Sequence, residues 1–159
     1  KIEIFSKRLY ERNDVDIPAL SHYVPAIEGP EDDLTKRFPL QLITWKGRNR
    51  ANSTQFANPW LQEVQRQELW INPIDAKRRN IAEGDSVKVN NDRGVTQVPV
   101  KITQRIMPGV VALQAGAWWQ PDDNGIDQGG CANVLTSARS TAMAHGNAHQ
   151  TLLVEVTKA

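Results

Sequence analysis

Hydrophobic and polar residues alternate along residues 86–90, where valines stand at alternate positions. A second extended run covers residues 95–103, and an Asn-Asp-Arg-Gly sequence separates the two runs. A period of two is typical of a half-buried β-strand, and Asn, Asp and Gly tolerate the positive φ angles of a tight turn. The pattern therefore predicts a β-hairpin, with Pro99 placing part of its second strand at a sheet edge or a bulge.

A short helix is predicted just before this hairpin, over residues 73–80. Asn72 can cap it with its side-chain oxygen, Pro73 suits the first helical position, and Asp75 lies near the positive end of the helix dipole. Comparable patterns of caps and apolar positions predict the other elements. We expect further strands at residues 1–5, 39–44, 68–72, 110–113 and 152–156, and short helices at residues 7–13 and 58–64.

Short strands with small helices between them are typical of a mainly β domain that closes into a barrel, because closure removes exposed sheet edges. The barrel is expected to occupy residues 38–159. Residues 14–38 carry three prolines and an acidic cluster at 31–33, a composition that disrupts regular structure. We therefore interpret residues 1–37 as an irregular N-terminal lead.

Composition and charge narrow the function classes. The 159 residues match one domain, and 19 basic against 18 acidic residues leave a formal net charge of +1. No global field points to nucleic acid or a membrane surface, so any anion site is expected to be local. No apolar run approaches the roughly 18 residues that span a bilayer, and no secretion signal is recognisable. Because the chain begins at Lys1, we expect a mature product or an excised piece.

Metal ligands are scarce in the sequence. Cys131 is the only cysteine, which excludes an internal disulfide and, with three scattered histidines, a thiolate zinc site. A lone cysteine usually behaves as a small hydrophobic residue, and we expect Cys131 to be half-buried. Asp122, Asp123 and Asp127 resemble a calcium loop but lack its downstream Glu, so we expect all three to face solvent.

Several separated motifs carry a resemblance to a known family. They are WINPxDAxxxxIxxGDxVxVxNDRG at residues 70–94, the segment 107–113, Gly-Ala-Trp at 116–118, Asn-Val-Leu-Thr at 133–136 and Gly-Asn at 146–147. In this order they resemble the C-terminal molybdopterin-dinucleotide-binding domain of the dimethyl sulfoxide reductase family, over roughly residues 38–158. The branch most similar holds the catalytic subunits of bacterial anaerobic dimethyl sulfoxide reductases. The resemblance implies an aspartate-decarboxylase-like, six-stranded double-psi β-barrel.

The resemblance also implies a function. The domain would clamp the molybdopterin guanine dinucleotide of a molybdenum oxidoreductase that reduces an S-oxide or N-oxide. The cofactor would be a bis(molybdopterin guanine dinucleotide) molybdenum centre, with an iron-sulfur cluster in other domains or subunits. Implied partners are the other domains of the catalytic subunit, an iron-sulfur electron-transfer subunit and a membrane anchor subunit. The parent would be bacterial, exported by the twin-arginine route to the periplasmic side of the membrane, and this chain alone would be inactive.

The loop at residues 45–55 is the first candidate binding site. A glycine there allows close backbone approach, three cations suit a pyrophosphate, and small polar side chains offer hydrogen bonds. A solvated hairpin tip would show a similar composition, and the resemblance favours the cofactor. The candidates are Lys46, Gly47, Arg48, Arg50, Asn52, Ser53 and Thr54. Asn52 departs from relatives that carry histidine at its position, so its contact is less secure than that of Ser53.

Three further loops contribute candidates. Asp92 lies in the Asn-Asp-Arg-Gly turn, where it fixes the turn or touches the cofactor, and we interpret it first as structural. Asn133 and Thr136 follow Gly129-Gly130 and either cap local structure or bind a ligand; the resemblance places them against the dinucleotide. Asn147 belongs to the Gly-Asn motif that the resemblance places near a pterin. No catalytic residue or metal ligand is predicted.

Two alternative functions stay open. The same domain occurs in relatives of another activity, such as a formate dehydrogenase or a nitrate reductase. A double-psi barrel can also be a peptide-interaction module, as in unfoldase chaperones. A nucleotide site needs the polar groups of loop 46–55 to converge with Asn133, Thr136 and Asn147, whereas a peptide site needs an exposed apolar groove.

Overall fold

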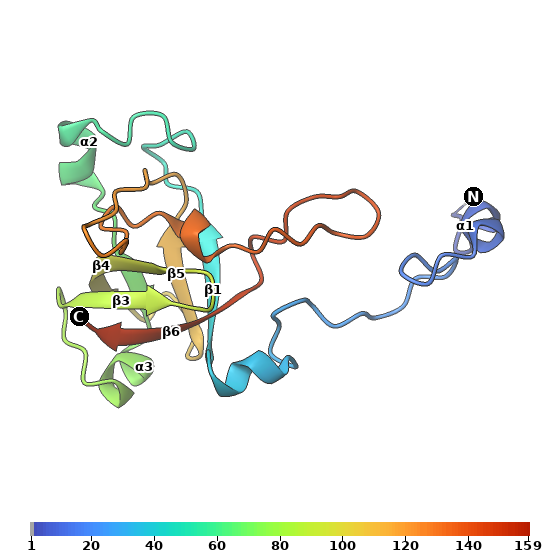
Figure 1. Ribbon diagram of the computed structural model, residues 1–159, viewed down its shortest axis with the longest axis horizontal. Coiled ribbons are helices and arrows are strands. Elements are labelled where there is room, and N and C mark those ends of the chain that lie inside the picture. The colour runs from blue at the N-terminus through green and yellow to red at the C-terminus, as the bar shows by residue number, and fades with distance from the viewer. Residues whose placement is uncertain (1) are drawn as a thin grey trace.

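Six short strands close into a barrel in the computed structural model, which describes residues 2–159. The strands are β1 (Leu40–Trp45), β2 (Leu69–Ile71), β3 (Ser86–Asn90), β4 (Val95–Ile102), β5 (Val110–Gln114) and β6 (Leu152–Lys158). The helices are α1 (Lys7–Arg12), α2 (Pro59–Val64) and α3 (Pro73–Arg78), with the 3₁₀-helices η1 (Asp33–Lys36) and η2 (Ala132–Leu135). The predicted mainly β barrel with short helices is confirmed (Figure 1).

The strand order around the barrel is β1-β5-β2-β4-β3-β6. Strand β5 lies between β1 and β2, parallel to the first and antiparallel to the second. Strand β2 in turn lies between β5 and β4, antiparallel to the first and parallel to the second. In both cases one strand lies between two strands that are consecutive in the sequence: β5 between β1 and β2, and β2 between β4 and β5. The two cases share β2 and β5. This interlocking confirms the double-psi topology.

Apolar side chains fill the barrel interior, as the alternating patterns predict. In β3, Val87 and Val89 are fully buried whereas Ser86 is exposed, and Leu40 and Leu42 of β1 point inward in the same way. Burying such a side chain contributes about 1.5–3 kcal/mol, so the core is the main source of stability. The barrel has no free edge. Pro99 lies in β4 opposite Ser86 of β3, directly before the residues of β4 that pair with β2.

The short helices begin where the sequence predicts. Asn72 caps α3, and its Nδ2 also donates to the Ile106 carbonyl at 2.7 Å. Asp75 in the first turn is buried and accepts a hydrogen bond from the Gly109 N–H at 2.6 Å. The cap and first turn therefore anchor the connection between β4 and β5. No helix among the described residues is long and apolar enough to cross a membrane.

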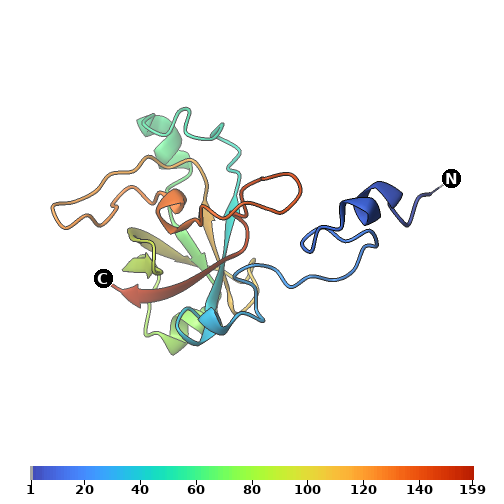
Figure 2. The same ribbon diagram turned by 45° about the vertical axis from the view of Figure 1, so that its right-hand side comes forward.

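The N-terminal lead extends away from the barrel and carries α1 near its far end (Figures 1 and 2). Ser6 caps α1 as predicted, by accepting from the Leu9 N–H. The predicted strand at residues 1–5 is wrong for residues 2–5, which are exposed, with only an isolated bridge from Phe5 to Leu20; residue 1 lies outside the described part. A strand needs a partner, and a closed barrel offers no edge to pair with.

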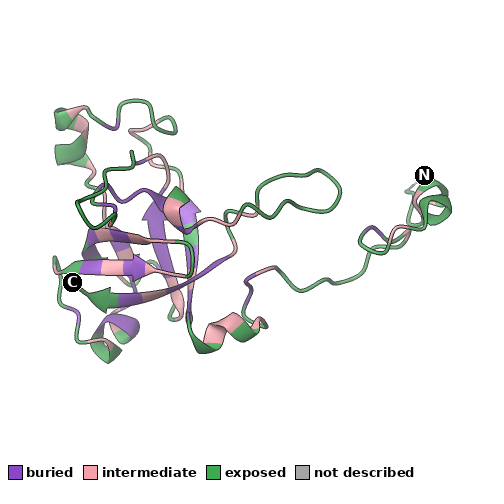
Figure 3. Cartoon of the chain, viewed as in Figure 1, coloured by how far each residue is buried: buried purple, intermediate pink, exposed green. Residues whose placement is uncertain are grey.

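The lead becomes buried where it reaches the barrel. Most of it is exposed, as the prediction of an irregular segment implies, but Glu28 and Gly29 are buried, as is Ile17 nearer the N-terminus (Figure 3). The 3₁₀-helix η1 was not predicted; Asp32 caps it by accepting from the Leu34 N–H at 2.9 Å. The acidic cluster that suggested irregular chain thus partly serves as a helix start.

Candidate functional site

Two long connections meet at one end of the barrel. Parallel strands β1 and β5 finish side by side, with Trp45 opposite Gln114, and β6 runs antiparallel to β1 and begins at that end. The connection from β1 to β2 and both ends of the connection from β5 to β6 therefore gather together, at the upper part of the barrel in Figure 1. Loops carried by a rigid scaffold are a common place for ligand sites. All predicted site residues except Asp92 lie on these connections.

The loop after β1 presents cations and hydrogen-bonding groups to solvent. Lys46 and Arg48 are exposed, and the Lys46 ammonium donates to the side-chain oxygen of Asn52. Ser53 and Thr54 are also exposed. Residues 46–55 contain no Asp or Glu. An anionic group at this loop would therefore meet positive charge and donors without a competing carboxylate on the same segment.

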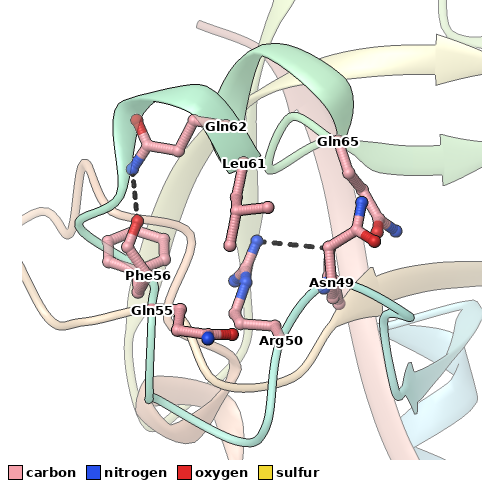
Figure 4. Close-up of a pocket in the computed structure, with 8 residues that line it drawn as sticks. Asn49, Arg50, Gln55, Phe56, Leu61, Gln62 and Gln65 are labelled. Carbon is pink, nitrogen blue, oxygen red and sulfur yellow. Dashed lines mark hydrogen bonds between the residues drawn. The ribbon is translucent and has the colours of Figure 1, made fainter.

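The Arg50 side chain lines a pocket between loop 46–55 and α2 (Figure 4). Its guanidinium donates to Gln67 Oε1 at 3.0 Å and to Gln114 Oε1 at 3.2 Å, and lies 5.0 Å from the centre of the Phe56 ring. Burial lowers the pKa of Arg50, but a guanidinium remains charged at neutral pH. Arg50 thus joins the loop to Gln67 and Gln114 through hydrogen bonds. A contact between Arg50 and a cofactor stays a prediction.

Gln114 is a buried polar residue that the sequence reasoning missed. It ends β5 with 1% of its surface exposed, and a Cβ on Gly47 would overlap its amide group. Gly47 therefore lets the Gln114 amide pack against the backbone of the loop. Among the described residues the Gln114 Nε2 has no hydrogen-bond partner. The available signal was a single glutamine closing the otherwise apolar run 110–114.

The segment that follows β5 contacts loop 46–55 directly. A Cβ on Gly116 would overlap the Asn52 carbonyl, and the Trp118 Nε1 donates to the Ser53 carbonyl at 2.9 Å. These contacts hold the main chain of two predicted cofactor contacts against the end of β5. The structure thus links loop 46–55 with the Gly-Ala-Trp motif, which lies more than 60 residues away in the sequence.

Asn133 and Thr136 lie in and just after η2, at the same end of the barrel (Figures 1 and 2). The Asn133 side chain is exposed. Thr136 Oγ1 donates to the Asn133 carbonyl at 2.9 Å, so part of its role is local capping. Asn91 in the β3–β4 turn donates to the Leu135 carbonyl at 2.9 Å. The turn and η2 are therefore in direct contact.

Asp92 forms an ion pair with the N-terminal lead. The Arg37 guanidinium donates to both carboxylate oxygens, at 3.0 and 2.5 Å, and both side chains are more than half exposed. This contact gives the structural interpretation of Asp92 a physical basis, while a contact with the cofactor stays a prediction.

Asn147 lies apart from the other candidates. It bridges Ser140 within a hairpin of residues 137–151 that projects from the barrel (Figures 1 and 2). At the base of this hairpin, Gln150 exchanges hydrogen bonds of 3.0 and 2.8 Å with the main chain of Thr44. The hairpin is thus anchored beside loop 46–55, and the residues near its tip are not.

The expectation that Asp127 faces solvent is wrong, whereas Asp122 and Asp123 are exposed as predicted. The buried Asp127 carboxylate accepts hydrogen bonds from Thr96 Oγ1 at 2.7 Å and from the N–H groups of Gln120, Gly129 and Cys131 at 2.8, 3.1 and 2.6 Å. Burial by itself raises the pKa of Asp127, but these hydrogen bonds lower it by more, so the pKa lies below its usual value. No local pattern revealed this role, because backbone groups supply most of the donors.

Cys131 is buried, as a small hydrophobic residue would be, and burial raises the pKa of its thiol. The thiol is therefore protonated at neutral pH and is a poor nucleophile. Within residues 2–159 no group of three His, Cys, Asp or Glu side chains lies close enough to hold a metal ion.

A double-psi barrel with a polar, locally cationic loop end defines a class of ligand-binding domain, and comparison with known proteins identifies the family. Residues 40–153 match the family described as the molydopterin dinucleotide binding domain, and the chain belongs to this family.

Its relatives include dimethyl sulfoxide reductase DmsA of Escherichia coli (strain K12), which is 45% identical over 99% of this chain and 20% of the relative. The dimethyl sulfoxide/trimethylamine N-oxide reductase of Rhodobacter capsulatus is 36% identical over 99% of this chain and 20% of the relative. The chain thus spans about a fifth of the length of these relatives.

The fold also occurs in a solved structure of low sequence similarity. Acetylene hydratase from Pelobacter acetylenicus superposes with a TM-score of 0.81 at 14% identity, covering 100% of this chain and 23% of that one. At this identity the likeness concerns the fold alone.

Proposed function

We propose that this chain is the cofactor-clamping domain of a bacterial molybdenum oxidoreductase that reduces an S-oxide or N-oxide. Family membership and two reductase relatives support this assignment. The observation that carries it is the gathering of exposed cations, amides and hydroxyls at one end of a rigid barrel. Residues 38–159 form the binding domain, and residues 1–37 are the lead that connects it to the rest of the parent.

The donor chemistry of the loop end fits a dinucleotide. Lys46 and Arg48 would hold phosphate oxygens, because both cations are exposed on a loop without carboxylates. Ser53 and Asn133 would supply hydrogen bonds to the sugar and base. Gln114 has a buried Nε2 that finds no partner in the described residues, which is consistent with a site completed by a ligand or another domain.

Further contacts are proposed at Gly47, Arg50, Asn52, Thr54, Asp92, Thr136 and Asn147. Arg50 and Asp92 would have to release or share their present partners, Gln67 and Gln114 for the former and Arg37 for the latter. We therefore expect their contributions to be smaller than those of Ser53 and Asn133.

The bound group is proposed to be one dinucleotide of a bis(molybdopterin guanine dinucleotide) molybdenum centre. When bound, this centre supplies the oxygen-atom chemistry and the electron transfer. The residues of this chain bind and orient it, and an iron-sulfur cluster is expected in other domains or subunits. Other domains of the same polypeptide are the direct partners, with an iron-sulfur subunit and a membrane anchor subunit in the complex. Export by the twin-arginine route to the periplasmic side of the membrane completes the proposal.

Guanosine diphosphate tests the assignment, because it is the nucleotide end of the proposed cofactor. In a titration of the 159-residue chain followed by amide NMR shifts, we expect the largest changes at residues 46–54 and 133–136. Ser53→Ala and Asn133→Ala should each weaken binding about fivefold, the effect of one neutral hydrogen bond.

Matched controls are Ser21→Ala and Asn124→Ala, which remove the same groups from exposed positions elsewhere. Both are expected to leave the affinity unchanged. No shifts at millimolar guanosine diphosphate, or shifts outside these loops, would contradict the nucleotide site. An apolar peptide that binds the chain and shifts the same residues would favour an interaction module instead.

A further inference from the structure

The β3–β4 turn contacts two distant parts of the chain through one arginine. Arg93 donates to both carboxylate oxygens of Glu28, at 2.7 and 2.8 Å, and its Nε donates to the Leu135 carbonyl at 2.8 Å. Glu28 belongs to the N-terminal lead, and Leu135 is the last residue of η2. A planar guanidinium with donors on two sides is suited to bridging two acceptors in a fixed geometry.

Glu28 is buried and hydrogen-bonded, although it lies in an irregular segment. Only 5% of its surface is exposed, and its Oε2 also accepts from the Leu153 N–H of β6 at 3.2 Å. Its φ angle is +54°, a conformation that non-glycine residues rarely adopt. Several contacts therefore overcome a local backbone cost at this one residue.

The β3–β4 turn makes two further contacts with η2. The Leu135 carbonyl accepts a second hydrogen bond, from Asn91 Nδ2 at 2.9 Å. A Cβ on Gly94 would lie 2.8 Å from the Val134 carbonyl, so the turn packs directly on the helix backbone. The two contacted residues lie between Asn133 and Thr136, the proposed contacts of the nucleotide.

We propose that Glu28 and Arg93 are positioning residues for the nucleotide site, and that the Glu28 segment of the lead is an obligatory part of that site. The inference rests on the proposed function and extends it: the lead, through Arg93, sets the place of Asn133 and Thr136. A buried charge that loses its partner is strongly unfavourable, so the pair tolerates few other geometries. Supporting residues of this kind determine how accurately the contacting groups are placed.

The same turn offers an internal comparison. The ion pair between Arg37 and Asp92 also joins the lead to the turn, but both side chains are more than half exposed. Exposed pairs contribute little, because water screens them. If nucleotide binding required only that the lead be attached to the barrel, breaking either ion pair would weaken binding equally. If Arg93 positions η2, only loss of the Glu28 pair weakens binding.

The test measures guanosine diphosphate affinity and ligand-free amide shifts in the 159-residue chain. Glu28→Gln and Arg93→Lys should each weaken binding about tenfold, the loss of a charged hydrogen bond, and shift the amides of residues 133–136 before ligand is added. Arg93→Lys keeps the positive charge but cannot bridge Glu28 and Leu135 as a fork, and it serves if Glu28→Gln fails to fold. Arg37→Gln is the matched control and should neither weaken binding nor shift these amides before ligand is added.

The outcomes separate this inference from the proposed function. Wild-type affinity in folded Glu28→Gln and Arg93→Lys, with unshifted 133–136 amides, would overturn the positioning role. If the unmodified chain fails to bind guanosine diphosphate, the proposed function fails, and the ligand-free amides alone decide whether Glu28 positions η2. Equal effects of Arg37→Gln and Glu28→Gln would reduce the role to simple tethering and also overturn the inference.

Discussion

We expect that replacing Asp127 by asparagine lowers the free energy of unfolding by about 3 kcal/mol at pH 7 and disorders the loop that leads into η2. The carboxylate is buried and accepts hydrogen bonds from Thr96, Gln120, Gly129 and Cys131. Asparagine has nearly the same shape but turns one acceptor into a donor that faces other donors. Hydrogen bonds to a charged group contribute about 1.5–3 kcal/mol, and an unsatisfied buried group adds a cost of similar size. Urea unfolding measures the difference.

The Asp127 effect depends on pH in a defined direction. Because the folded-state pKa lies below its usual value, the carboxylate stabilises the fold fully above the unfolded-state pKa, which is about 3.9. This contribution is lost as pH falls from about 3.9 through the lower folded-state pKa. The stability difference between the wild type and Asp127→Asn should therefore be constant near neutrality and shrink in this acid range.

Asp122→Asn is the control in the same loop. Asp122 is exposed, although it accepts from the Asn124 and Ile126 N–H groups. Its substitution should cost about 1 kcal/mol or less, because water replaces lost partners. A loss for Asp127→Asn no larger than that of Asp122→Asn would show that the buried carboxylate does not organise the loop.

We expect that replacing Gly116 by alanine destabilises the chain by about 3 kcal/mol and displaces loop 46–55. Gly116 has a φ of +94°, which an alanine adopts only with strain, and its Cβ would overlap the Asn52 carbonyl. Backbone strain contributes about 1–3 kcal/mol and overpacking about the same. Because the obstructing atom is backbone, relief requires loop 46–55 to move. Thermal unfolding and the amide shifts of residues 46–55 measure the two effects.

Gly125→Ala separates strain from overlap. Gly125 has a similar φ of +77°, but a Cβ added there would meet nothing within 4 Å. Its substitution should cost about 1 kcal/mol and leave loop 46–55 in place. If Gly116→Ala matched this small cost and the loop shifts stayed absent, the close approach of Gly116 to Asn52 would not constrain the site.

The sequence predicted most elements of the fold because their signals are local. Asn58 and Asn72 each precede a proline and cap the helices that follow, as expected. The valines of residues 86–90 alternate inward, and the predicted hairpin closes at the Asn-Asp-Arg-Gly turn. Residues 1–5 show the limit of this reasoning: alternation is present, but no partner strand is available to residues 2–5. A strand pattern is necessary for a strand and is not sufficient.

The candidate site divides in the same way. The composition of loop 46–55 marked it as polar and cationic, and Lys46 and Arg48 are indeed exposed there. The loop's neighbours were beyond local patterns, because Gln114 and Gly116 reach it through the barrel topology. The direction of Arg50 was equally unpredictable, since an arginine in a loop points to solvent unless buried acceptors such as Gln67 are brought beneath it.

The sequence by itself determined the element types, the apolar core positions and the polar character of the loop end, since caps, periodicity and turn residues act over a few positions. Only the tertiary structure decided the interlocking of β2 and β5, the burial of Asp127 and the junction of Glu28, Arg93 and Leu135. Each depends on at least one hydrogen bond or strand pair between residues far apart in the chain, which for Asp127 is the hydrogen bond from Thr96. Such contacts depend on how the strands are arranged in the closed barrel, which is why short-range patterns do not contain them.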